Sequence, residues 1–230
     1  MNFWYRVTIG ITGTYYRLAG MRMKVLGTEN IPSGPKLIVG NHPNATDAFT
    51  MPFIFKEQLI FLIEDKVFDI PFIGYIFKKA DMIPVIAGQG RDIVRTAIDR
   101  IREGYSVCIF PEGKLTGTHN VLHAGTGVAR IAVETGVPIV PIGFYVPNRF
   151  IKIFRSRQRG KETVGGWQVG GCCYVNIGEP LRASFDEQIE KSYLYYRHFT
   201  EQLMERVINL AEQTERLASQ TAYTSQKVQT

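Results

Sequence analysis

The chain has 230 residues, 45% of them hydrophobic, which is enough to bury one sizeable core, and we expect a single domain with small extensions. Its net charge of +6 indicates an anionic partner, and the sign alone leaves open nucleic acid, an acidic membrane surface or a phosphorylated substrate. The three cysteines are too few and too unevenly spaced for a disulfide framework, and no pair of Cys-x-x-Cys units is present. We therefore expect a reduced, intracellular protein.

Residues 1–25 mix aromatic and basic side chains. Only ten uncharged residues separate Arg6 from Arg17, whereas a membrane-spanning helix needs roughly 18 or more. The segment also lacks the order of charged, apolar and small residues found in a signal peptide. We interpret 1–25 as a segment that lies at a membrane interface, because aromatic rings and cations suit the headgroup region. A first helix that simply packs on the core agrees equally well with the pattern.

From Leu26 onward, short apolar runs alternate with longer amphipathic stretches. Strands are predicted at 36–39, 59–62, 82–85, 107–110 and 139–142, and helices at 46–58, 89–103 and 123–135. This alternation favours an α/β fold with a largely parallel central sheet flanked by helices. Further along, we predict a mobile loop at 155–171, a strand at 173–177, a long helix at 185–217 and a frayed polar tail at 218–230. The catalytic domain is placed at 26–217.

His42 and Asp47 follow the predicted strand at 36–39 and stand at the start of a helix. Side chains at this place in an α/β fold face a ligand more often than the core. A turn from loop to helix can bring the carboxylate to one imidazole nitrogen, which leaves the other nitrogen to take a proton from a substrate hydroxyl. By themselves, a His and a nearby Asp at a helix start are more often structural.

The run Phe110-Pro111-Glu112-Gly113-Lys114-Leu115-Thr116-Gly117 also follows a predicted strand. Glu112 and Lys114 would lie at the same edge of the sheet as His42. A carboxylate there can accept hydrogen bonds from acceptor hydroxyls, and the glycines let backbone N–H groups approach an oxyanion or phosphate. Alone, Pro-Glu-Gly is also compatible with a simple polar turn.

These blocks gain meaning in combination: Asn41-His42 with Asp47 five residues after the histidine, Phe110-Pro111-Glu112-Gly113 about seventy residues later, and then Gly136 to Gly143. With the lead-in Gly27 to Pro32 and the stretch Pro71 to Gly74, they resemble the glycerolipid acyltransferase family typified by lysophosphatidic acid acyltransferase. The resemblance extends from about Val25 to Gly143, more than half of the chain.

The resemblance implies transfer of a fatty acyl group from acyl-CoA or acyl carrier protein to a lysophospholipid hydroxyl, without an acyl-enzyme, a metal or a further cofactor. It implies that His42 is the base, that Asp47 orients it, and that Pro138 lies near the acyl chain. The remaining substrate-binding residues that it implies are Asn41, Glu112, Gly113, Lys114 and Thr116.

Two positions depart from the family pattern. The family commonly has Thr-Arg after Phe-Pro-Glu-Gly, where this chain has Lys114-Leu115, and Ile86-Ala87 replaces an Arg after Val85. These arginines are associated with the acceptor phosphate, to which a guanidinium offers two parallel hydrogen bonds. Lys114 or Arg91 is the substitute that this sequence offers, and the head group of the acceptor stays open.

Other enzyme classes fit the sequence less well. The nearest approach to a hydrolase nucleophile elbow, Gly104 to Cys108, lacks the final Gly and precedes a strand. Gly88-Gln89-Gly90 and Gly125-Thr126-Gly127 lack the third Gly of a dinucleotide fingerprint. His119 and His123 are four residues apart, but no third ligand is evident for a metal.

Two non-enzymatic functions compete with acyl transfer: a peripheral lipid-binding protein, and a nucleic-acid-binding protein that uses the basic cluster between Arg149 and Lys161. We favour the enzyme, with an anionic membrane surface, a lysolipid acceptor and an acyl thioester donor as partners, and no nucleic acid. The expected location is peripheral, on the cytoplasmic face of a membrane. A different lysolipid or glycolipid acceptor remains an alternative.

Overall fold

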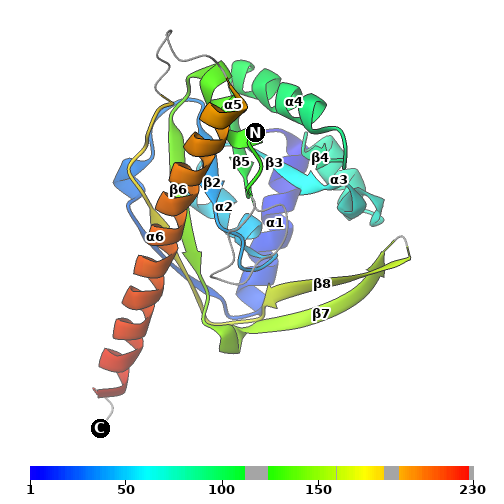
Figure 1. The fold of residues 1–230 in the computed structure, drawn as a ribbon. Helices are drawn as coiled ribbons and strands as arrows, with labels where there is room; N and C mark the ends of the chain where they lie inside the picture. The colour runs from blue at the N-terminus through cyan, green and yellow to red at the C-terminus, as the bar shows by residue number, and fades with distance from the viewer. Residues whose placement is uncertain (112–123, 159, 184–191, 228–230) are drawn as a thin grey trace.

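A computed structural model describes residues 1–111, 124–158, 160–183 and 192–227 (Figure 1). Its central sheet has the strand order β1-β9-β6-β2-β5-β3-β4. The strands of this sheet are β1 (Arg22–Leu26), β2 (Leu37–Gly40), β3 (Leu59–Glu64), β4 (Ile83–Val85), β5 (Ser106–Ile109), β6 (Ile139–Tyr145) and β9 (Cys172–Ile177).

The sheet is largely parallel, as predicted. Strands β6, β2, β5, β3 and β4 run in one direction. Strand β9 is antiparallel to β6, and β1 is parallel to β9, so these two run in the opposite direction. The five apolar runs predicted as strands coincide with β2 to β6 within a few residues, because strands buried on both faces appear as continuous apolar sequence.

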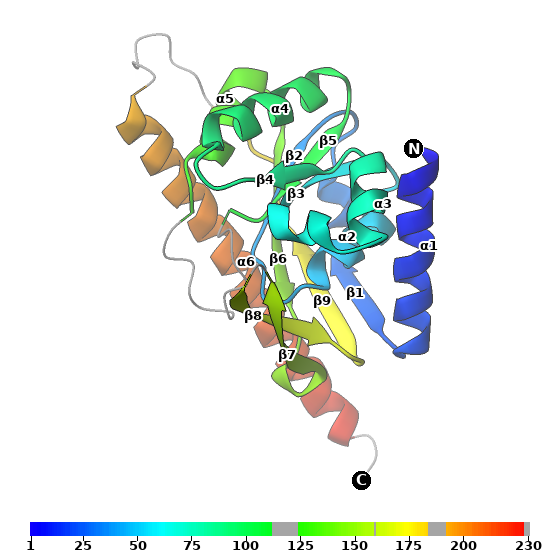
Figure 2. The same ribbon diagram turned by 90° about the vertical axis from the view of Figure 1, so that its right-hand side faces the viewer.

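Helices cover both faces of the sheet (Figures 1 and 2). Leu37 and Val39 point to the face covered by α4, α5 and α6, whereas Ile38 points to the face covered by α1, α2 and α3. The helices are α1 (Phe3–Leu18), α2 (Asp47–Ile54), α3 (Ile73–Lys79), α4 (Gly90–Arg102), α5 (Gly127–Thr135) and α6 (Tyr193–Lys227), with short 3-10 turns at η1 (Thr28–Asn30), η2 (Asp65–Asp69) and η3 (Asn148–Phe150).

The N-terminal segment forms α1 and β1 and packs on the domain along one side. Tyr5 is fully buried in the core, while Phe3 and Leu18 on the same helix are 69% and 84% exposed. Beside it, Phe72 at the start of α3 is also 84% exposed. Within the described residues, no helix has the length and apolar character needed to cross a membrane.

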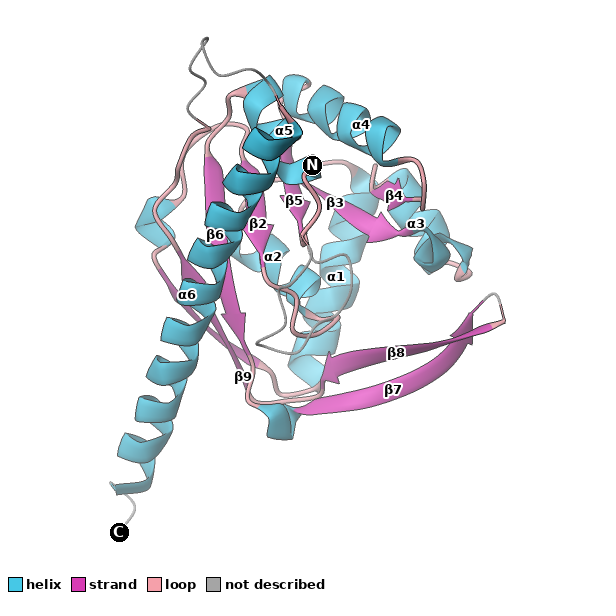
Figure 3. Ribbon diagram, viewed as in Figure 1, coloured by secondary structure: helices cyan, strands magenta, loops and turns pink. Residues whose placement is uncertain are grey.

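Within 155–171, predicted as a loop, residues 155–158 and 161–168 instead lie in strands of a second sheet. Strands β7 (Ile151–Gln158) and β8 (Lys161–Gln168) pair antiparallel in a ribbon that projects from the domain beneath α3 (Figures 1 and 3). The prediction missed it because the ribbon is exposed on both faces, so apolar and polar residues do not alternate along its strands. Helix α6 likewise continues to Lys227, beyond the predicted end at Leu217, and α2 ends at Ile54 rather than Gln58.

Candidate active site

Two of the sequence motifs meet at the carboxyl edge of the parallel strands. Strands β2 and β5 are hydrogen-bonded neighbours, so the chain segments that follow them emerge side by side. The ring of His42, after β2, stacks on Phe110, after β5, with centroids 4.1 Å apart and an interplanar angle of 13°. Four of the predicted acceptor-site residues lie outside the described residues, as do His119 and His123; the four are Glu112, Gly113, Lys114 and Thr116.

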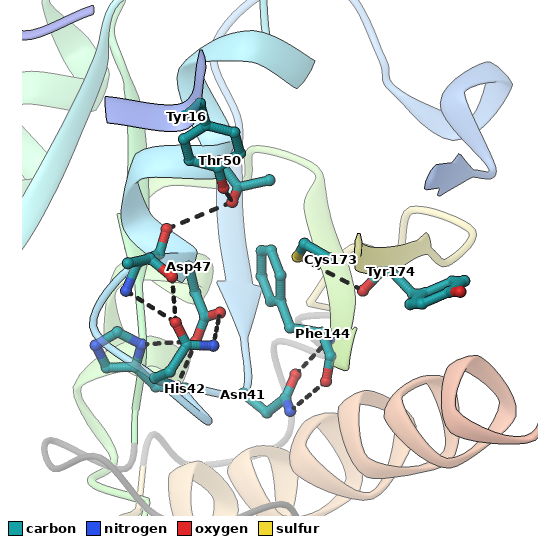
Figure 4. Close-up of polar contacts among 10 residues, drawn as sticks. Tyr16, Asn41, His42, Asp47, Thr50, Phe144, Cys173 and Tyr174 are labelled. Atoms are coloured by element: carbon teal, nitrogen blue, oxygen red, sulfur yellow. Dashed lines mark hydrogen bonds and ion pairs between the residues drawn. The ribbon is translucent and has the colours of Figure 1, made fainter. Parts of the chain in front are cut away.

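His42 and Asp47 form a hydrogen-bonded pair (Figure 4). The Nδ1 atom of His42 lies 3.3 Å from Oδ2 of Asp47, and the carboxylate is buried, whereas a fifth of the His42 side chain is exposed. An ionised carboxylate only accepts hydrogen bonds, so the proton of a neutral imidazole is assigned to Nδ1. Nε2 has no hydrogen-bond partner among the described residues, which leaves its lone pair to accept a proton from a substrate.

Asn44 holds the Asp47 carboxylate in place. Its backbone N–H donates to Oδ2 at 2.9 Å, and its side-chain Nδ2 donates to Oδ1 at 2.7 Å. The Asn44 Oδ1 atom in turn accepts from the backbone N–H of Thr46 at 3.0 Å and from the Thr46 hydroxyl. Each carboxylate oxygen therefore has a partner on the protein, which sets the direction in which Asp47 faces His42.

The loop is also fastened to the N-terminal helix. The hydroxyl of Thr50, on α2, donates to the backbone O of Thr46 and is hydrogen-bonded to the hydroxyl of Tyr16 on α1 (Figure 4). Burial raises the pKa of Tyr16 well above its usual range, so this hydroxyl stays protonated and can donate. A chain of hydrogen bonds thus extends from α1 to the His42–Asp47 pair.

The electrostatics of Asp47 reflect two opposed effects. Burial raises the pKa of its carboxyl above the usual value, because the charged form loses its hydration. Hydrogen bonds and charge attraction from His42, followed by the bonds from Asn44, act in the opposite direction. Asp47 is also the first residue of α2, where the helix dipole favours a negative charge.

Two other predicted substrate-binding residues take different places. Asn41 is buried, and its amide bonds the backbone of Phe144: Nδ2 donates to the Phe144 O at 3.0 Å and Oδ1 accepts from its N–H at 2.7 Å. It thereby clamps the end of β2 to β6, and substrate contact by Asn41 stays a prediction. Pro138 precedes β6, and its carbonyl accepts from Leu37 at the amino end of β2, the opposite edge of the sheet from His42. The structure does not bring Pro138 to the site.

The fold and this site can be compared with those of known proteins. A model of the Acyltransferase family matches residues 22–145, more than half of the chain, and this range contains His42, Asp47 and Phe110. The chain belongs to this acyltransferase family. The family predicted from the motifs is therefore confirmed.

Individual acyltransferases support the assignment. A 1-acyl-sn-glycerol-3-phosphate acyltransferase of Borreliella burgdorferi is 31% identical over 137 residues, covering 58% of this chain and 55% of the relative. A protein of the same name from Bacillus subtilis is 27% identical over 199 residues, covering 85% and 91%. The matched region covers 36% and 54% of the length of two further acyltransferases of this name. The chain therefore spans about half the length, or less, of several of the relatives it matches.

A solved acyltransferase structure shares the fold. The 1-acyl-sn-glycerophosphate (LPA) acyltransferase PlsC from Thermotoga maritima superposes with a TM-score of 0.63 at 20% identity, covering 89% of this chain and 78% of that chain. At this identity the likeness establishes the α/β architecture and its largely parallel sheet.

The residues that position the His42–Asp47 pair were not predicted from the sequence. Asn44 and Thr46 lie between His42 and Asp47, and the signal that the sequence carries is that Asn and Thr in a turn often bond the nearby backbone. Tyr16 is 34 residues from Thr50 along the chain, and no local pattern could have joined them.

Proposed function

We propose that the chain transfers a fatty acyl group from acyl-CoA or acyl carrier protein to the hydroxyl of a lysophospholipid, 1-acylglycerol-3-phosphate foremost, in phospholipid biosynthesis. The observation that carries the proposal is the His42–Asp47 pair at the carboxyl edge of the sheet, with Nε2 free to accept a proton. Family membership and the names of the relatives support the reaction class.

The proposed step is direct transfer. Nε2 of His42 takes the proton of the acceptor hydroxyl while the hydroxyl oxygen forms a bond with the carbonyl carbon of the thioester. The carbon–sulfur bond then breaks, and the thiolate leaves and recovers the proton from the imidazolium. Asp47 stabilises the imidazolium that exists between these events and keeps its ring oriented. The products are the ester and a free thiol, and no acyl-enzyme or metal enters the scheme.

We further propose that the enzyme works as a peripheral protein at the cytoplasmic face of a membrane with an anionic surface. Exposed apolar side chains on α1 and α3 support this, because Phe3, Leu18 and Phe72 are all more than two-thirds exposed. Aromatic and apolar groups of this kind gain free energy at the boundary between headgroups and acyl chains. The net charge of +6 adds attraction to an acidic leaflet.

The identity of the acceptor has a specific alternative. A lyso-ornithine lipid O-acyltransferase of Rhodobacter capsulatus is 29% identical over 119 residues. The arginines that the family associates with the acceptor phosphate are replaced here at Lys114-Leu115 and at Ile86. A lysolipid without a phosphate is therefore the second candidate acceptor.

The test is a panel of lysolipid acceptors offered to the purified protein with acyl-CoA or with acyl carrier protein. His42→Ala and Asp47→Asn should lose about 10²- to 10⁴-fold in acyl transfer, the range over which general base catalysis contributes. His198→Ala, which removes an exposed histidine from α6, is the matched control and should retain parent activity. Full activity of His42→Ala, or acylation of no acceptor by the parent, would exclude the proposed reaction.

A further inference from the structure

We propose that the β7–β8 ribbon is a second membrane-docking element, which binds the surface of an anionic lipid bilayer and so holds the catalytic loop at the membrane. This inference rests on the proposed function for its biological meaning, and its binding test does not depend on catalysis. The ribbon follows the region matched by the family model, which ends at residue 145.

From Ile153 outward, the ribbon exposes apolar side chains on both of its faces. In the antiparallel register, Ile153 lies opposite Gly166, Phe154 opposite Gly165, and Arg155 opposite Val164. Because side chains alternate between faces, Ile153 and Val164 share one face and Phe154 occupies the other. These three side chains are 62%, 54% and 52% exposed. The two glycines have no side chains that could cover Ile153 and Phe154.

Cations accompany the apolar side chains on both faces. Arg155 and Arg157 share the face of Ile153, Lys152 shares the face of Phe154, and all three are exposed. Glu162, the one acidic residue of the two strands, bonds Arg155 at 3.2 Å. The ribbon therefore presents an excess of positive charge.

This arrangement favours a bilayer as the occupant. Apolar and cationic groups on both faces suit a hairpin whose outer part is surrounded by lipid headgroups, where apolar groups are buried and cations meet anionic lipid. A two-stranded ribbon without further packing is marginally stable in water, so a second phase that covers its apolar groups would stabilise it. Figures 1 and 2 show the ribbon extending beyond the sheet.

The root of the ribbon, where residues 166–168 of β8 pair with residues 151–153 of β7, is bonded directly to the catalytic loop. The N–H of Ala45, between His42 and Asp47, donates to the Gly166 O at 2.8 Å. Next to it, Trp167 packs on Phe49 of α2 with ring centroids 5.8 Å apart. Binding of the outer part would therefore hold the proton-accepting edge of the site close to a lipid acceptor whose chain stays in the bilayer.

The ribbon is also continuous with the surface of α1. The hydroxyl of Tyr15 donates to the backbone O of Gln168, at the end of β8, and the N–H of Arg22 donates to the Gly171 O. Leu18, 84% exposed, lies between these two contacts along the chain. The ribbon root and the exposed end of α1 thus adjoin each other, and one membrane could engage both.

The experiment is co-sedimentation of the full chain with vesicles of phosphatidylcholine, with and without phosphatidylglycerol. The double variant Arg155→Gln/Arg157→Gln should bind the anionic vesicles roughly twenty-fold more weakly, since each cation near an anionic surface contributes about a five-fold factor. Ile153→Ser/Phe154→Ser should weaken binding to a similar degree. The matched control, Arg95→Gln/Arg102→Gln, removes the same charge from α4 and should retain most of the binding.

A measurement on the parent chain avoids variants altogether. Amide hydrogen exchange in β7 and β8 should slow when anionic vesicles are added, while exchange in α4 stays unchanged. Unchanged exchange in the ribbon, or equal losses for the ribbon and α4 variants, would overturn the proposal. So would tighter binding to duplex DNA than to anionic vesicles at matched salt, or a ribbon variant that binds vesicles normally but has a raised KM for acyl carrier protein.

Activity separates this inference from the proposed function. The ribbon variants should keep the parent's turnover of a short-chain lysophosphatidate dissolved as monomers and lose turnover of the same acceptor in vesicles. If the parent binds vesicles through the ribbon but acylates no acceptor, the docking inference stands and the proposed reaction fails. If acylation occurs in both forms and the ribbon variants match the parent in both, the reaction stands and the docking inference fails.

Discussion

Substitution of Asn44 by alanine tests whether this residue sets the charge of Asp47. The Asn44 side chain donates to Oδ1 of the buried carboxylate at 2.7 Å. A hydrogen bond to a charged group contributes about 1.5–3 kcal/mol. Loss of this bond should therefore raise the pKa of the Asp47 carboxyl further above its usual value.

The pH dependence follows from the sign of this shift. Asp47 must be ionised to orient His42, and a higher pKa means that it is protonated at a higher pH as the solution is acidified. The acidic limb of kcat/KM in Asn44→Ala should therefore lie at higher pH than that of the parent. The measurement is a pH profile of acyl transfer to a monomeric acceptor, for parent and variant.

Stability should show the complementary pattern. A buried carboxyl with a raised pKa destabilises the folded state above that pKa, and this penalty disappears as the pH falls through it. The loss in unfolding free energy caused by Asn44→Ala, about 2–4 kcal/mol from the broken bonds to Asp47 and Thr46, should therefore be largest near neutral pH and shrink in acid.

The matched control is Asn30→Ala, which removes an Asn side chain that donates to the Ile177 O at 2.8 Å, away from the site. It should lower stability without moving the acidic limb. If the limb of Asn44→Ala overlays that of the parent while its Tm falls, Asn44 has a structural role only and does not set the charge of Asp47.

Three further substitutions test the framework around the site. Asn41→Ala leaves the N–H and C=O of Phe144 without their side-chain partner and should lower the unfolding free energy by about 2–4 kcal/mol in urea denaturation. Gly143→Ala places a Cβ 2.3 Å from the backbone of α6, so the Tm should fall by roughly 4–10 °C. Glu57→Ala removes the partner of the buried Lys36 ammonium, 2.5 Å away, and should cost about 1–2 kcal/mol, a value reduced because Glu57 is about a third exposed.

Two of these substitutions, Glu57→Ala and Gly143→Ala, have a control in the same chain. Lys36→Met/Glu57→Ala should recover much of the stability lost in Glu57→Ala, because the unpaired buried charge is gone. Gly10→Ala, on α1, meets nothing within 4 Å and should leave the Tm close to that of the parent or raise it. Equal effects of Gly10→Ala and Gly143→Ala would contradict the packing explanation, and an unchanged unfolding free energy in Asn41→Ala would contradict the clamp.

The sequence by itself determined the features that depend on neighbouring residues. The apolar runs of β2, β3, β5 and β6 are continuous because these strands are buried on both faces, so their positions could be predicted without a structure. The pairing of His42 with Asp47 was also predictable, because one turn at the end of a strand joins them. The combination of motifs along the chain indicated the acyltransferase family, which the family model confirms.

Tertiary structure alone decided the features that join distant residues. The clamp from Asn41 to Phe144 spans 103 residues, and the bond from Tyr16 to Thr50 spans 34. The parallel pairing of β2 with β6 placed Pro138, which precedes β6, at the edge of the sheet opposite His42, which follows β2. The β7–β8 ribbon escaped prediction for a related reason: its outer part is exposed on both faces, so burial imposes no alternation there, and only the pairing across its turn reveals the strands.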